Sequence, residues 1–121
     1  MIHVLIVDDQ ALNRILLSKM LEQEGYKISV AYNGLDALNV LKREQIDIVL
    51  LDVLMPVMDG FQFMEEFNEI LPKLNKNIKV YMVSSSMDPK DLKKAKRIDE
   101  ISDYLVKPLN SKDIKEILTK M

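Results

Sequence analysis

Five short apolar runs alternate with segments of helical spacing along this chain, and this alternation restricts the fold more than any other feature. Runs rich in Val, Ile and Leu are typical of strands, and apolar residues three and four positions apart are typical of helices. Strands that alternate with helices favour a parallel sheet covered by helices on both faces. The strand order 2-1-3-4-5 suits five strands whose functional edge lies at the first and third. The sequence therefore predicts an α/β fold, a doubly wound (βα)5 domain with a five-stranded parallel sheet.

Local signals predict where the elements begin and end. Leu12, Ile15, Leu16 and Met20 recur at helical spacing in the first helix, and Gly25 is suited to its C′ position. The expected strands are residues 3–7, 26–32, 47–51, 78–83 and 103–106.

The other helices are predicted from capping residues. Asn33 is the expected N-cap of the second helix, and Asp59 that of the third, which should end near Leu71 and Pro72. Pro89 suits the first turn of a fourth helix that runs to about Ile98. A last helix should finish with the chain.

Composition excludes several classes of protein. A chain of 121 residues and 14.0 kDa has room for one core, and no apolar run approaches the ~20 residues of a spanning helix. Zero cysteines exclude disulfides and thiolate metal sites, and a net charge of −2 argues against a nucleic-acid surface. We expect one cytoplasmic domain over residues 1–121, without an output domain, that binds neither membranes nor nucleic acid directly.

Acidic residues follow two of the expected strands. Asp52 comes directly after the apolar residues 48–51, and Asp8 and Asp9 come after residues 3–7. In a parallel sheet these ends share one edge, together with Ser84 and Lys107 from later strands. Crowded carboxylates repel unless a cation lies among them, and oxygen ligands favour Mg²⁺, with Mn²⁺ as an alternative. A lysine and a hydroxyl beside them would hold a phosphoryl group during its transfer.

The chain resembles the receiver domain of two-component response regulators, whose fold is flavodoxin-like or CheY-like. The motifs that carry this resemblance span almost the whole chain: Asp8 and Asp9; Asp52; Met55 and Pro56; Met58, Asp59 and Gly60; Ser84; Tyr104; Lys107 and Pro108.

The resemblance implies that Asp52 is phosphorylated by a histidine kinase or a histidine phosphotransfer protein. Asp9 would bind Mg²⁺ directly and Asp8 directly or through water. Asp52 and the backbone carbonyl of Leu54 would complete the protein ligands. Such a domain is a regulatory phosphoacceptor, not an enzyme, and its only catalysis is its own phosphotransfer and dephosphorylation.

The resemblance also implies a switch. Lys107 would pair with the phosphoryl oxygens, while Ser84, or Ser85 as the alternative, would move toward them and Tyr104 would turn inward. The peptide bond between Lys107 and Pro108 is expected to be cis. The fourth helix, fifth strand and fifth helix would form the surface that signals to an unknown protein target.

Leu54 departs from the pattern of many receivers, in which this position tunes hydrolysis. An apolar side chain there cannot orient an attacking water. We therefore expect a phosphoryl lifetime longer than that of receivers with an amide or an acid at this position, and Leu54→Asn should shorten it. His3 is expected to be a surface or strand-edge residue, and the lysine-rich helix near Lys93 a solvated face, with a docking face as the alternative.

Three other functions fit part of the sequence. A metal-dependent phosphohydrolase usually needs a second aspartate two residues beyond the nucleophile, where this chain has Leu54. A flavin carrier needs a phosphate-binding first loop, which Asp8 and Asp9 would repel. A constitutive interaction module would not need the acidic set and Lys107.

Overall fold

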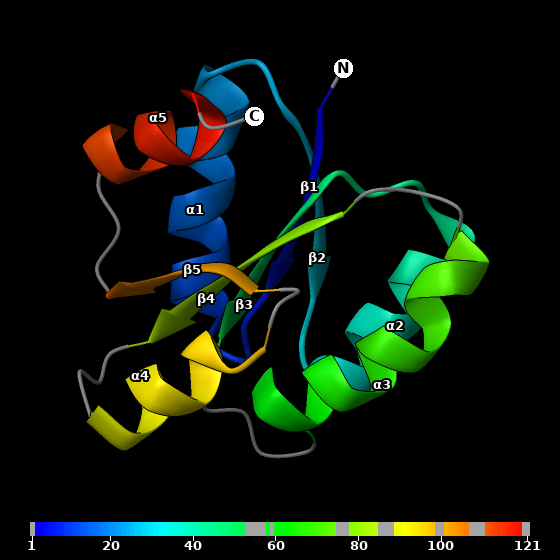
Figure 1. Ribbon diagram of the computed structural model, residues 1–121. Coiled ribbons are helices and arrows are strands. Elements are labelled where there is room, and N and C mark those ends of the chain that lie inside the picture. The colour runs from blue at the N-terminus through cyan, green and yellow to red at the C-terminus, as the bar shows by residue number, and fades with distance from the viewer. Residues whose placement is uncertain are drawn as a thin grey trace.

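The computed structural model describes residues 2–52, 58, 60–74, 78–84, 89–98, 101–106 and 111–119. Within these residues strands and helices alternate five times, which confirms the predicted alternation (Figure 1). The elements are β1 (His3–Val7), α1 (Ala11–Gln23), β2 (Lys27–Ala31), α2 (Gly34–Arg43), β3 (Ile48–Asp52), α3 (Gly60–Leu74), β4 (Lys79–Ser84), α4 (Pro89–Lys96), β5 (Ile101–Val106) and α5 (Ser111–Thr119).

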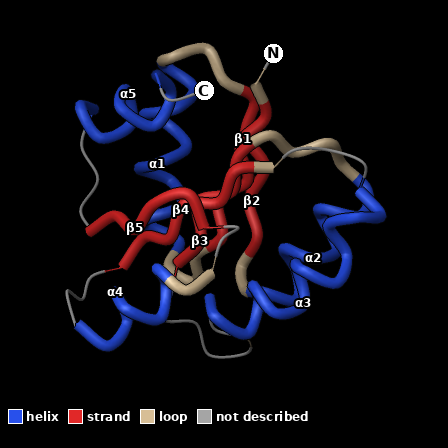
Figure 2. Tube along the Cα trace, in the orientation of Figure 1, coloured by secondary structure: helices blue, strands red, loops and turns tan. Residues whose placement is uncertain are grey.

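The strands form one parallel sheet in the order β2-β1-β3-β4-β5, as predicted. Figure 2 shows the strands as a central layer with helices on either side. Because every strand runs the same way, all carboxyl ends meet at one edge of the sheet.

Alternate residues of each central strand serve two separate cores. In β1, Leu5 and Val7 pack into a core with residues of α2, α3 and α4. Val4 and Ile6 pack into a second core with residues of α1 and α5, on the opposite face (Figure 1). All four side chains are at most 1% exposed, which explains why the strand reads as a continuous apolar run.

The second helix forms where its capping signal predicts it. The side chain of Asn33 accepts a hydrogen bond from the backbone N–H of Asp36 at 2.8 Å. Ala37, Leu38 and Leu41 are buried, so the apolar stripe of α2 faces the sheet.

The first helix is present, but its buried side differs from the stripe that predicted it. Leu17 and Leu21 are buried, whereas Leu12 is 67% exposed and Ile15 and Leu16 are each 51% exposed. Gly25 has a φ of +89° after the end of α1, as expected of a C′ glycine. The helix therefore carries an exposed apolar stripe on its first two turns.

Two predicted boundaries are wrong. Helix α3 continues through Pro72 to Leu74, because a proline in the last turn removes one hydrogen bond near the point where the helix ends in any case. Strand β5 begins at Ile101 rather than at residue 103. The pairing of β4 with β5 shifts between Val80 and Tyr81, and this irregularity accommodates Ser102 as an extra residue.

His3 is buried, at 6% exposure, which contradicts the expectation of a surface or strand-edge residue. His3 points to the same face of β1 as Leu5 and Val7, where Ser29 of β2 and Glu44 at the end of α2 lie against it. The His3 Nε2 atom lies 2.7 Å from the Ser29 hydroxyl, which donates to Glu44 at 2.7 Å. Because the hydroxyl has one proton, His3 Nε2 must be the donor to Ser29.

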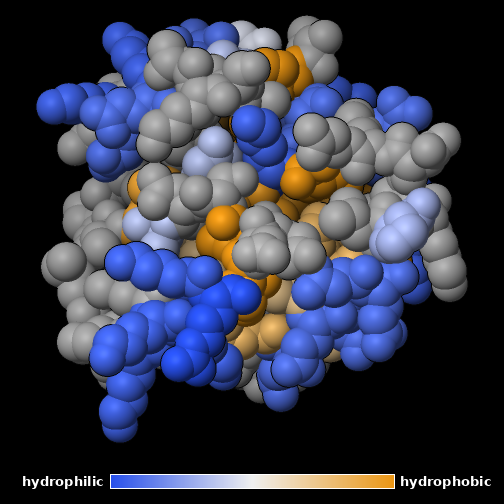
Figure 3. Space-filling view, viewed as in Figure 1, coloured by the Kyte–Doolittle hydropathy of each residue, from blue (hydrophilic) through white to orange (hydrophobic). Residues whose placement is uncertain are grey.

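The outer side of α4 is basic. Lys90, Lys93, Lys94, Lys96 and Arg97 are exposed, whereas Ala95 is buried against the sheet. Hydrophilic side chains accordingly cover the lower left of the molecule, where α4 lies (Figure 3). None of the helices in the described segments is long and apolar enough to cross a lipid bilayer.

Candidate acidic phosphoacceptor site

The register of two neighbouring strands brings Asp8 and Asp52 together. Val7 of β1 pairs with Leu51 of β3, so the next residue of each strand lies beside the other at the carboxyl edge. Parallel neighbours are about 4.8 Å apart, a distance that carboxylate side chains can bridge. The pairing of β1 with β3 therefore places the residues at the ends of these two strands side by side, as predicted.

Asp9 completes a cluster with these two residues. One carboxylate oxygen from each of Asp8, Asp9 and Asp52 lies within 4.8 Å of the others. Asp8 is 2% exposed and Asp52 is 6% exposed, whereas Asp9 is exposed. Three acids so close repel one another, and the two buried ones are poorly screened by solvent.

The backbone at Asp8 is held by hydrogen bonds. Its N–H donates to the carbonyl of Ala31 at 3.1 Å, and its carboxylate accepts the N–H of Gln10 at 2.9 Å. Gln10 is the N-cap of α1, and its side chain does not cap the helix. The Asp8 carboxylate therefore orders the turn that leads from β1 into α1.

The donor set fits a hard divalent cation. All the side-chain ligands are carboxylate oxygens, the type that Mg²⁺ prefers, and they lie within 4.8 Å of one another. Mg²⁺ keeps several waters in protein sites, so a partial set of ligands is what it uses. A bound cation would also remove the repulsion between the carboxylates.

The other predicted site residues are only partly described. Ser84 ends β4 beside Val106, the residue that precedes Lys107 in the chain. Tyr104 lies on β5 and packs, half-buried, against the core on the α4 side. Leu54, Ser85, Lys107 and Pro108 lie outside the described residues, as does the expected N-cap Asp59.

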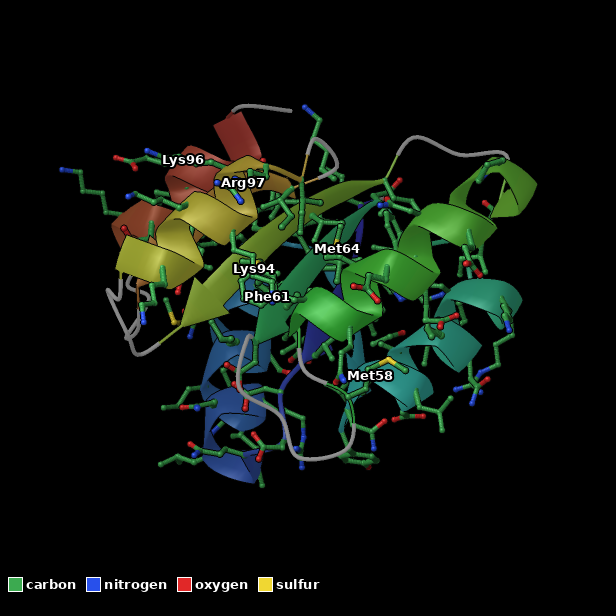
Figure 4. The ribbon with its side chains drawn as sticks, turned by 60° about the horizontal axis from the view of Figure 1, so that its bottom comes forward. Met58, Phe61, Met64, Lys94, Lys96 and Arg97 are labelled. Atoms are coloured by element: carbon green, nitrogen blue, oxygen red, sulfur yellow. The ribbon has the colours of Figure 1, made fainter. Side chains whose placement is uncertain are left out.

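Two contacts connect α3 and the turn before it to neighbouring helices. Lys94 of α4 places its Nζ atom 4.4 Å from the centre of the Phe61 ring, at the start of α3 (Figure 4). Met58 lies against the first residue of α2, because a Cβ built on Gly34 would be 2.8 Å from its Cγ and Sδ atoms.

Arg14 and Tyr32 border the site but were not anticipated from the sequence. Arg14 donates from Nη1 to the Asp8 carbonyl at 2.7 Å, and its guanidinium lies 4.4 Å from the centre of the Tyr32 ring. No local pattern in the sequence connects these positions, because the contact depends on how α1 and the β2–α2 turn meet.

The fold and the acidic cluster define a receiver domain, and comparison with known proteins agrees. The family described as the response regulator receiver domain matches residues 4–119, so the chain belongs to that family. Sporulation initiation phosphotransferase F of Bacillus subtilis is 32% identical over 117 residues, which cover 97% of this chain and 90% of that protein. Sensor histidine kinase RcsC of Escherichia coli is 46% identical over 67 residues, 55% of this chain but only 7% of the kinase.

Solved structures show the same fold. Response regulator protein TrrA of Thermotoga maritima, in complex with Mg²⁺ and BeF, is 31% identical with a TM-score of 0.82. Chemotaxis protein CheY4 of Vibrio cholerae is 29% identical with a TM-score of 0.87. Each comparison covers 99% of this chain and 98% of the other. The predicted family and fold class are therefore confirmed.

Proposed function

We propose that this receiver domain accepts a phosphoryl group on Asp52 and thereby switches a signalling surface. The observation that carries the proposal is the cluster of Asp8, Asp9 and Asp52, whose oxygens lie within 4.8 Å of one another at the carboxyl edge of the sheet. Asp52 is the proposed nucleophile because it ends β3, the central strand of the sheet. The proposed metal ligands Asp8 and Asp9 follow β1 on one side of it, and the proposed phosphoryl-binding residues belong to the ends of β4 and β5 on the other.

The reaction is an in-line displacement at phosphorus. An oxygen of the Asp52 carboxylate bonds to the phosphorus of a phosphohistidine while the P–N bond breaks, and the imidazole leaves with the electron pair. Asp8, Asp9, Asp52 and the carbonyl of Leu54 would hold Mg²⁺, or Mn²⁺ in its place. The cation supplies positive charge that offsets the charge developing on the phosphoryl oxygens.

The switch belongs to the same proposal. Lys107 would pair with the phosphoryl oxygens, and Ser84 would donate a hydrogen bond to them. The peptide bond between Lys107 and Pro108 would be cis. Phosphorylation adds ~1.5 to 2 negative charges, enough to shift an element between two arrangements. Tyr104, which packs on the α4 side of the sheet, would turn inward and alter the surface of α4, β5 and α5.

A histidine kinase or a histidine phosphotransfer protein is the proposed donor, and a protein of unknown identity the target. We place the domain in the cytoplasm, which a sequence without cysteines fits. Its chemistry would be confined to its own phosphotransfer and dephosphorylation.

The test is exposure of the protein to acetyl phosphate with Mg²⁺, followed by intact mass. We expect one phosphoryl group per chain and none in Asp52→Asn, whereas Glu65→Gln, an exposed acid of α3, should load like the wild type. Continuous release of phosphate at a high rate would identify a hydrolase instead. Labelling that survives in Asp52→Asn, or no labelling of the wild type, would overturn the proposal.

A further inference from the structure

Arg14 joins two turns at the edge of the acidic cluster. It lies in the first two turns of α1, half-buried, and its Nη1 donates to the carbonyl oxygen of Asp8 at 2.7 Å. The guanidinium carbon lies 4.4 Å from the centre of the Tyr32 ring, in the turn between β2 and α2. One side chain therefore contacts both the segment that carries the acids and the neighbouring turn.

The contact with Asp8 bears directly on where the carboxylates point. The Asp8 N–H is held by Ala31 and its carboxylate by the Gln10 N–H, so the Arg14 bond to its carbonyl restrains the next peptide plane. That plane leads to Asp9, and its orientation sets the direction of the Asp9 side chain. A hydrogen bond from a charged guanidinium is about twice as strong as one between neutral groups.

Tyr32 contacts Arg14 although its side chain is largely exposed. The side chain is 57% exposed, so it contributes little to the core. Its ring lies against the guanidinium, and a cation over an aromatic face at an exposed site is stabilised by about 0.5–1 kcal/mol. Because the Tyr32 ring already restrains the Arg14 side chain, Arg14 loses less conformational entropy when it forms its hydrogen bond to Asp8.

We propose that Arg14 is a positioning residue of the acidic site, that Tyr32 holds it in place, and that together they orient Asp8 and Asp9 toward a divalent cation. The inference rests on the proposed function, because it assigns these residues to the cation that assists transfer to Asp52. The Arg14 guanidinium donates to the carbonyl oxygen of Asp8, so Arg14 would act on the cation through the orientation of the acids.

The experiment compares Arg14→Met, Tyr32→Leu and Tyr32→Phe with the wild type. Mg²⁺ affinity is measured by calorimetry, phosphorylation by acetyl phosphate is followed over a range of Mg²⁺ concentrations, and the Asp9 amide is observed by NMR without metal. Arg97→Met, an exposed arginine after α4, is the matched control and should match the wild type throughout.

Arg14→Met should weaken Mg²⁺ binding about tenfold, the low end for groups that orient metal ligands. The rate at saturating Mg²⁺ should stay within about threefold, and the Asp9 amide should shift. Tyr32→Leu should weaken binding about two- to fivefold, which is the cation–π stabilisation converted to a ratio, and Tyr32→Phe should not.

Two results would overturn the inference, and they differ from each other. If Arg14→Met lowers the melting temperature but leaves Mg²⁺ affinity and the Asp9 amide unchanged, Arg14 is structural only and the proposed function stands. If the wild type takes up neither Mg²⁺ nor a phosphoryl group, the proposed function fails and this inference fails with it.

Discussion

Gly34 shows how a single missing side chain can set the distance between two turns. It is buried as the first residue of α2, and a Cβ there would lie 2.8 Å from Met58 Cγ and Sδ and 3.0 Å from Met58 Cβ. The ends of a methionine side chain can move, but its Cβ is attached to the backbone. The absence of a side chain at Gly34 therefore allows the start of α2 to approach Met58 closely.

Gly34→Ala should lower the free energy of unfolding by about 1–3 kcal/mol, the usual cost of overpacking. A gain of about 0.5–1 kcal/mol in helix propensity offsets only part of this cost. Met58→Ala in the same chain should restore much of the loss, because it makes room for the new methyl group. Urea denaturation of both single variants and the double variant measures the coupling, and strictly additive effects would show that the two residues are independent.

At the scale of elements, α1 leaves apolar residues uncovered beside the acidic site. Leu12, Ile15 and Leu16 are exposed on its first two turns, which begin directly after Asp9 and Gln10. Leu35, at the start of α2, is 52% exposed near the same edge of the sheet. A protein that brings a phosphohistidine to Asp52 must approach this edge, so we expect these residues to contact the donor.

Replacing Leu12 and Ile15 by Gln should therefore slow phosphotransfer from a kinase or phosphotransfer domain at least tenfold. A loss of 1.4 kcal/mol of binding is a tenfold effect, and burial of one such side chain contributes about 1.5–3 kcal/mol. Labelling by acetyl phosphate should be unchanged, because a small donor needs no docking surface. Val30→Gln, an exposed apolar residue of the edge strand β2, is the control. Equal loss with both donors would mean that the substitutions disturb the site itself.

At the scale of the whole molecule, we expect the acidic cluster to link stability to a cation. Three repelling carboxylates destabilise the folded protein, and a ligand that binds only the folded state stabilises it. At 100 times its dissociation constant such a ligand contributes about 2.7 kcal/mol.

Mg²⁺ at this excess should raise the melting temperature by about 10 °C in a domain of this size. Asp9→Asn should melt higher than the wild type without metal, because one repelling charge is gone, and should respond weakly to Mg²⁺. Glu65→Gln should respond like the wild type. Calorimetric scans with and without Mg²⁺ check these outcomes, and a wild type indifferent to Mg²⁺ would contradict them.

The sequence alone determined the alternation of strands and helices and the edge at which Asp8, Asp9 and Asp52 meet, whereas the strand order was predicted partly from the resemblance to receiver domains. These features depend on local signals, since a strand with alternating core contacts reads as an apolar run and Asn33 caps α2 through its own turn. Parallel strands then leave one place for residues that follow them. Boundaries near Pro72 and Ile101 were less predictable because one helical turn or one bulge adds little energy.

Tertiary structure alone decided which apolar face of α1 is buried, where His3 lies and what holds Asp8 in place. Both sides of α1 carry leucines, so the choice of Leu17 and Leu21 for the core depends on the angle at which the helix meets the sheet. His3 is covered because Ser29 and Glu44, both distant in sequence, lie against it, and Arg14 reaches Tyr32 because two segments distant in sequence are adjacent in space. Such contacts depend on positions in three dimensions, which spacing along a single chain does not record.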